Sequence, residues 1–260
     1  MRQILLSLTA TMVLSLNVAA IPVEEIVQKA NHAAYYQGSD GKAKVAMTIT
    51  DSQNRTRSRE FTILRRDNSE TDGSQKFYVY FRRPSDVAKT AFMVWKNEGS
   101  DDDRWLYLPA LDLVKRIASS DERTSFVGSH FFYEDVSGRS PQEDTHELVE
   151  ETEHYYVLKS TPKAPKAVEF SYYKSWIHKA TFLPVQIKYY DNKEENYRTY
   201  DALKVDTVDG YATVTGARMS DTRIGGMTEM HYTGVEYNRG IEEKIFSERY
   251  LRNAPRKELR

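Results

Sequence analysis

The sequence contains no cysteine among its 260 residues. This absence excludes disulfide bonds, thiolate metal sites, a cysteine nucleophile and lipidation on cysteine. A charge excess is also missing, because 37 basic residues face 38 acidic ones and leave a net charge of −1. We therefore expect no nucleic-acid partner, since such proteins usually carry a basic surface. No stretch rich in proline, glycine and serine divides the chain, which predicts a single domain over residues 21–260.

The common motifs of catalysis and cofactor binding are missing as well. The sequence has no Gly-x-Ser-x-Gly nucleophile elbow, no phosphate-binding loop and no dinucleotide-binding fingerprint. Its six histidines never pair at the i, i+4 spacing that places two zinc ligands on one helix face. We predict that the protein is not an enzyme and that it has no cofactor and no metal.

One acidic cluster, Asp101, Asp102 and Asp103, carries three consecutive carboxylates. Calcium loops usually space their ligands two residues apart and include a glycine for the turn, and this cluster has neither feature. We interpret the cluster as a solvated turn. The alternative is a docking patch for a basic partner.

The first 20 residues have the pattern of a secretory signal peptide. Arg2 is their only charge, Ile4–Leu16 is apolar, and Val18–Ala20 supplies small residues at the expected cleavage site. The apolar run of about 13 residues is shorter than the roughly 20 that span a bilayer. We predict a signal peptide over 1–20 and a soluble periplasmic protein. The alternative is an N-terminal membrane anchor.

Aromatic residues are abundant, with 18 Tyr, 10 Phe and 3 Trp, and such side chains favour half-buried β-strands. Apolar residues recur at helical spacing from Pro22 to Gly38, which predicts one amphipathic helix. From Lys42 onward the period becomes two, as in Val45, Met47 and Ile49. Continued to residue 237, this alternation predicts a mainly β (α+β) fold with 11–13 sequential antiparallel strands.

Two segments depart from the strand pattern. Residues 119–140 combine glycines with four aromatic residues, Phe126, Phe131, Phe132 and Tyr133. We interpret this segment either as a loop whose rings plug the edge of the core or as a cover over a cavity. Residues 252–260 are rich in basic side chains and are expected to form a frayed polar tail, with a membrane-surface or partner contact as the alternative.

Several distinctive motifs occur along the chain. They are Asp-Asp-Asp-Arg-Trp-Leu-Tyr-Leu-Pro-Ala-Leu at 101–111, Val-Lys-Arg-Ile at 114–117, Phe-Val-Gly-Ser at 126–129, Tyr-Glu-Asp-Val-Ser-Gly at 133–138, Phe-Ser-Glu-Arg-Tyr-Leu at 246–251, Phe92-x-Val94-Trp95, Trp176-Ile177 and Leu183-Pro184. Together they resemble the motifs of the outer-membrane lipoprotein-sorting proteins of the LolA-like superfamily. The resemblance covers about residues 24–251 and is most specific over 101–138.

The resemblance implies an incomplete antiparallel β-barrel whose concave apolar face is covered by helices or loops. It also implies a periplasmic carrier or chaperone that binds lipid or lipoprotein acyl chains for transfer toward the outer membrane. Such a protein would contact membranes transiently, and an RND-type inner-membrane transporter is a plausible partner. The alternative is a non-carrying accessory subunit that docks on an RND-type exporter.

Strand parity suggests which side chains face the concave side. Alternating residues of one face point the same way, so the apolar set should line either a cavity or a closed core, and parity alone does not separate the two. We predict a hydrophobic ligand-binding surface, with the four aromatic residues of 119–140 as its cover. The predicted lining is Val45, Met47, Ile49, Phe61, Ile63, Phe77, Val79, Phe81, Leu106, Leu108, Phe170, Tyr172, Val185, Ile187 and Met230.

Overall fold

The computed structural model describes residues 20–69 and 72–260. The predicted signal peptide therefore lies, except for Ala20, outside the described residues. The strands are β1 Asp40–Asp51, β2 Thr56–Asp67, β3 Gln75–Arg83, β4 Ala91–Lys96, β5 Asp103–Leu108, β6 Leu113–Ile117, β7 Asp144–Glu151, β8 Tyr155–Pro162, β9 Tyr172–His178, β10 Pro184–Tyr190, β11 Asn196–Val208, β12 Tyr211–Asp221 and β13 Gly226–Tyr237. The α-helices are α1 Val23–Asn31, α2 Tyr133–Ser137, α3 Glu248–Arg252 and α4 Arg256–Leu259.

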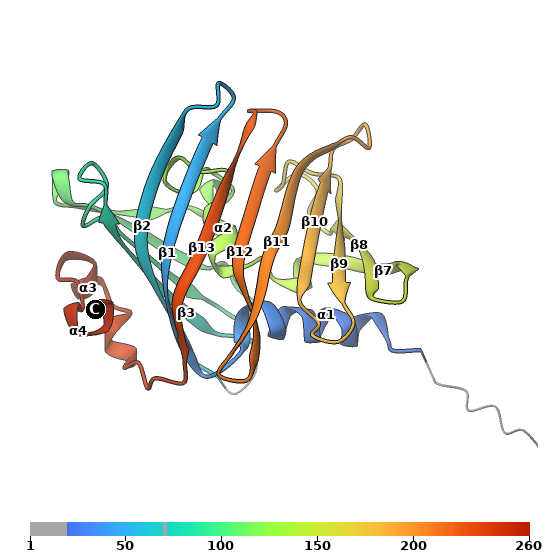
Figure 1. Cartoon of the computed structure of the whole chain (residues 1–260), viewed down its shortest axis with the longest axis horizontal. Coiled ribbons are helices and arrows are strands. Elements are labelled where there is room, and N and C mark those ends of the chain that lie inside the picture. Colours follow the sequence, from blue (N-terminus) through green and yellow to red (C-terminus); the bar gives the residue numbers. More distant parts are fainter. Residues whose placement is uncertain (1–19, 70–71) are drawn as a thin grey trace, which may run out of the picture.

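All of these strands form one antiparallel sheet in the order β6-β5-β4-β3-β2-β1-β13-β12-β11-β10-β9-β8-β7. The first strand pairs with the last at the centre, for example Val45 with Tyr232 (Figure 1). The sheet curves but does not close, because β6 and β7 remain as free edges. The predicted mainly β fold, an incomplete antiparallel barrel of 11–13 strands, is confirmed.

The connection from β6 to β7 must cross the whole sheet, because these two strands are its opposite edges. This crossing segment, residues 118–143, contains α2 and passes over the face that carries Phe61 and Phe81. We call that face the inner face. Figure 1 shows α2 behind the central strands. The aromatic segment that interrupts the strand pattern is therefore a lid forced onto the inner face by topology.

Helix α1 lies near the ends of the strands of the second half of the sheet (Figure 1). Pro22 precedes it, and Glu24 and Glu25 stand in its first turn, where the helix dipole favours negative charge. The helix continues as one π-helical turn, η1 His32–Tyr36. Its apolar stripe buries Ile26 and Ala30 against a cluster that contains Leu158 and Ile177. Among the described residues, no helix is long and apolar enough to cross a membrane.

The outer face of β2–β5 is covered by the C-terminal segment, residues 241–260. Leu251 and Leu259 pack into a cluster with Leu64 and Tyr78 of the sheet. The Tyr78 hydroxyl donates a hydrogen bond to the Tyr250 carbonyl at 2.8 Å. The prediction of a frayed tail over 252–260 is wrong, because α4 turns its leucine onto the sheet and leaves the basic side chains in solvent.

Candidate ligand-binding cavity

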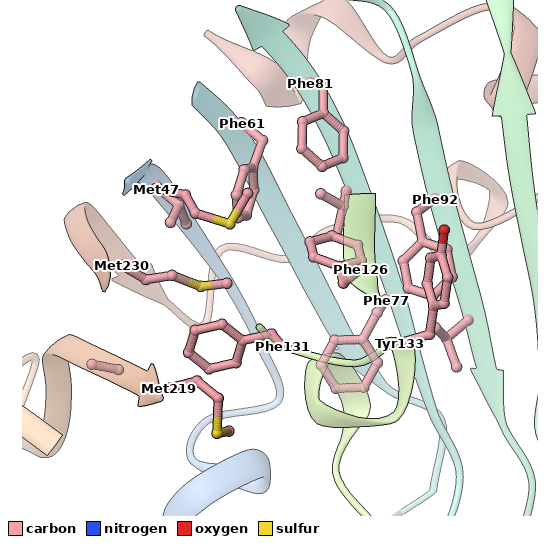
Figure 2. Packing of buried hydrophobic residues seen from close by; sticks show 14 of the residues in the cluster. Met47, Phe61, Phe77, Phe81, Phe92, Phe126, Phe131, Tyr133, Met219 and Met230 are labelled. Carbon is pink, nitrogen blue, oxygen red and sulfur yellow. The ribbon is translucent and has the colours of Figure 1, made fainter. Parts of the chain in front are cut away.

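One end of the inner face, which holds the C-terminal half of β1, is filled by the crossing segment. The ring of Phe126 lies 5.6–6.1 Å from the rings of Phe61, Phe81, Phe92 and Tyr133 (Figure 2). These distances are typical of well-packed aromatic pairs. We call this region the packed end. Its side chains form a packed core, with Phe61 and Phe126 at the border to the cavity described next.

The other end of the inner face holds a cavity of about 390 Å³. It lies between the N-terminal half of β1 with its neighbouring strands, the helix formed by α1 and η1, and the crossing segment. This volume falls within the 300–1,000 Å³ that is usual for small-molecule sites. The apolar wall residues contributed by the helix are small: Ala30, Ala33 and Ala34, together with Val27. We call this region the cavity end.

The predicted lining residues divide between the two ends. Six of them line the cavity: Phe61, Ile63, Phe77, Val79, Ile187 and Met230. Val45, Met47, Ile49 and Phe81 are buried in the core cluster, and Leu106 packs against it. Phe170 belongs to a separate cluster with Tyr189 and Tyr197. Leu108, Tyr172 and Val185 are partly exposed and lie away from the cavity wall.

The four aromatic residues predicted as a cover have different positions. Phe126 and Phe131 belong to the core cluster and also line the cavity, whereas Tyr133 contacts only the core. The ring of Phe132 lies under the guanidinium group of Arg198, with 3.9 Å between them. The crossing segment thus uses Phe126 and Phe131 both to fill the packed end and to form part of the cavity wall.

The acidic cluster has partners within the chain. Asp102 forms an ion pair with the buried Arg104 at 2.8 Å, and Asp103 pairs with Arg116. Asp101 accepts a hydrogen bond from the Ser119 hydroxyl at 2.8 Å. Across the described ranges, no group of three or more acidic or histidine side chains is placed to hold a metal ion. A docking role for Asp101–Asp103 stays a prediction.

Sequence reasoning missed a buried ion-pair network that holds α2 in place. Arg123 donates two hydrogen bonds to Glu169, both at 2.7 Å, and also pairs with Glu134. Arg139 contacts Glu134 at 3.1 Å and Asp144 at 3.0 Å. Burial raises the pKa of Glu169, but the hydrogen bonds and charge of Arg123, with further hydrogen bonds that include Tyr197, together outweigh it and lower the net pKa. The motif at 133–138 contains Glu134, but the spacing of residues within that motif does not indicate that the network extends to Glu169.

The cavity wall also contains polar side chains that parity did not select. Glu134, Asp135 and Arg139 come from the crossing segment, and Tyr35 and Tyr200 come from η1 and β11. Asp135 pairs with Arg198, a side chain that is completely buried. The high tyrosine content was a signal that could have pointed to these hydroxyls.

A curved open sheet with a helix-covered cavity on its inner face defines a carrier-like class of fold. Residues 73–253 match a family model whose description is "Uncharacterized protein". The chain belongs to this family, and its fold is that of the outer-membrane lipoprotein-sorting proteins of the LolA-like superfamily. No curated protein sequence matches the chain.

Three solved structures share this architecture. A DUF1329 family protein from Desulfovibrio piger is 27% identical, with a TM-score of 0.80 over 89% of this chain and 100% of the other. A putative outer membrane lipoprotein-sorting protein domain from Vibrio parahaemolyticus is 27% identical, with a TM-score of 0.78 over 88% and 97%. A LolA superfamily protein from Nitrosomonas europaea, at 18% identity, has a TM-score of 0.68 over 89% and 100% and supports the fold alone.

Proposed function

We propose that the protein is a periplasmic carrier or chaperone that binds lipid or lipoprotein acyl chains in its cavity for transfer toward the outer membrane. The observation that carries the proposal is the 390 Å³ space between the inner face of the sheet and a helix that presents alanines to it. Similarity to a putative outer membrane lipoprotein-sorting domain supports the same class of cargo.

The energetics of lipid transfer fit such a site. Each methylene group exposed to water costs about 0.8 kcal/mol, so a sixteen-carbon chain costs about 12 kcal/mol. A carrier must offer apolar surface of comparable extent and keep it from solvent when empty. The helix covers part of this surface, and Met219 and Met230 on the wall can adapt to chains of different shape.

Native mass spectrometry of protein purified from the periplasm tests the proposal. We expect co-purifying lipid on the wild-type protein and much less on Val214→Phe. This substitution replaces a small side chain on the cavity wall by a phenyl ring that fills part of the space. Val149→Phe is the matched control, because Val149 is 44% exposed and lies away from the wall. Equal lipid on both variants would place the cargo elsewhere.

The alternative role, an accessory subunit on an RND-type exporter, predicts a different result. Such a protein would remain empty after extraction and after incubation with several acyl ligands, and would be recovered with the exporter. Wild-type protein without lipid in both assays would favour this role over carriage.

Export to the periplasm is part of the proposal and has its own test. The mature chain should begin at Ile21 and should be released by osmotic shock. An intact mass that includes Met1, with the protein in the membrane pellet, would contradict this part.

A further inference from the structure

Six tyrosines line the cavity, and four of them, from four different elements, make no strong hydrogen bond through the hydroxyl. These four are Tyr35 of η1, Tyr189 of β10, Tyr200 of β11 and Tyr232 of β13. Among the described residues, the hydroxyls of Tyr35, Tyr189 and Tyr200 have no hydrogen-bond partner, and Tyr189 is only 9% exposed. The Tyr232 hydroxyl contacts only the sulfur of Met230, at 3.4 Å, and a thioether is a weak acceptor.

Other buried tyrosines, including Tyr173 on the cavity wall, have partners. The hydroxyls of Tyr78 and Tyr36 donate to backbone carbonyls at 2.8 and 3.2 Å. The hydroxyls of Tyr173 and Tyr197 donate to carboxylates at 2.9 and 3.1 Å. Polar groups removed from water are normally hydrogen-bonded, so these hydroxyls, which lie on the cavity wall without a partner among the described residues, point to a partner that the protein chain does not supply.

The surroundings of these hydroxyls indicate which partner fits. Burial, followed by the charge of Asp135, raises the pKa of Tyr35 well above its usual value. Burial also raises the pKa of Tyr189 to about 12. The phenols therefore stay protonated and act as donors at neutral pH. The cations among the described lining residues, Lys42, Arg65 and Arg139, are each paired with a carboxylate of the chain, so none is left unpaired to receive an anionic ligand group.

We propose that Tyr35, Tyr189 and Tyr200 form a polar subsite inside the cavity that donates hydrogen bonds to an uncharged oxygen of the ligand, the ester carbonyl of an acyl chain. This inference rests on the proposed carrier function and narrows its ligand class. A bare hydrocarbon would leave the three donors unpaired, and a free carboxylate would find no unpaired cation among the described lining residues. An esterified acyl chain satisfies the donors and places its methylenes on the apolar wall.

Competition binding with the delipidated full-length protein tests the subsite. The readout is displacement of the fluorescent probe N-phenyl-1-naphthylamine by methyl palmitate, octadecane or palmitate. We expect methyl palmitate to bind about tenfold more tightly than the other two. In the double variant Tyr189→Phe/Tyr200→Phe, methyl palmitate should lose about five- to tenfold in affinity, while octadecane should bind as it does to wild type.

Tyr172→Phe is the matched control, because its ring stacks on Tyr190 away from the cavity wall. Tyr35→Phe is a second subsite variant if the double variant does not give a native circular dichroism spectrum. Equal affinity for ester and hydrocarbon, or an ester preference unchanged in the subsite variants, overturns the subsite and leaves the carrier function standing. A preference for palmitate overturns the choice of an uncharged group. Failure of all three ligands to bind wild type overturns the carrier function and the subsite together.

Discussion

The two ends of the inner face differ although the same strands build both. At the packed end, Phe81 of β3 packs against Phe126 of the crossing segment, and Met47 of β1 belongs to the same core cluster. At the cavity end, Ile63 of β2 and Val79 of β3 line the space beneath a helix that contributes three alanines to the wall. The strands supply a similar apolar surface in both places. The size of the side chains on the covering element therefore decides whether a strand residue becomes core or cavity wall.

Removing the central ring of the packed end should give the largest effect. Phe126→Ala should lower the free energy of unfolding by about 3–5 kcal/mol, because the ring is 1% exposed and contacts four other aromatic rings. Ile187→Ala, on the partly buried cavity wall, should cost less than about 2 kcal/mol. Urea denaturation measures both values. Similar losses would remove the distinction between the two ends.

Two glycines allow the contact between the crossing segment and the helix to be measured separately. Gly138 and Gly128 both have φ +78°, but a Cβ at 138 would lie 2.5 Å from the Tyr35 ring, whereas at 128 it meets no atom within 4 Å. Alanine at either position should cost about 1–3 kcal/mol from backbone strain. Gly138→Ala should cost at least about 1 kcal/mol more than Gly128→Ala, because the ring must move.

Thermal melts of the two glycine variants measure this difference. We also expect Gly138→Ala, but not Gly128→Ala, to change ligand affinity, because Tyr35 lines the cavity. If the two variants lose the same stability, the Tyr35 contact does not hold the cavity end together.

The smallest expected effect concerns the point where the crossing segment leaves the first half of the sheet. Burial raises the pKa of Glu122 from 4.5 to about 7, although the Arg104 guanidinium, 2.7 Å away, opposes the shift. The folded protein thus keeps a proton that the unfolded chain releases, so this residue's contribution to stability falls as the pH rises from about 4.5 to 7. Glutamine at this position does not titrate. The Tm of Glu122→Gln minus the Tm of wild type should therefore increase by a few degrees as the pH rises from 5 to 8.

Glu153→Gln is the control, because the Glu153 side chain is 88% exposed. Its melting temperature should keep a constant offset from wild type over the same pH range. A constant offset for Glu122→Gln as well would show that the proton on Glu122 is not linked to folding.

The elements of the fold follow closely from local pattern. Alternation such as that of Val45, Met47 and Ile49 depends on neighbours along one strand, and a sheet with a buried face requires it. The amphipathic helix near the N-terminus was predicted for the same reason, because its stripe repeats every three to four residues. Residues 252–260 were mispredicted as a frayed tail, because Leu259 alone gives no periodic signal among the charges.

The sequence by itself determined the strands, the helix and the set of apolar side chains that face inward. Only the tertiary structure decided which of those side chains form a wall and which a core. Phe81 and Val79 are neighbours on one face of β3, but Phe81 packs beside Phe126 and Val79 borders the cavity. Whether a strand residue becomes wall or core depends on where the crossing segment and the helix lie. Contacts between residues far apart in the chain, such as Arg123 with Glu169, set these positions.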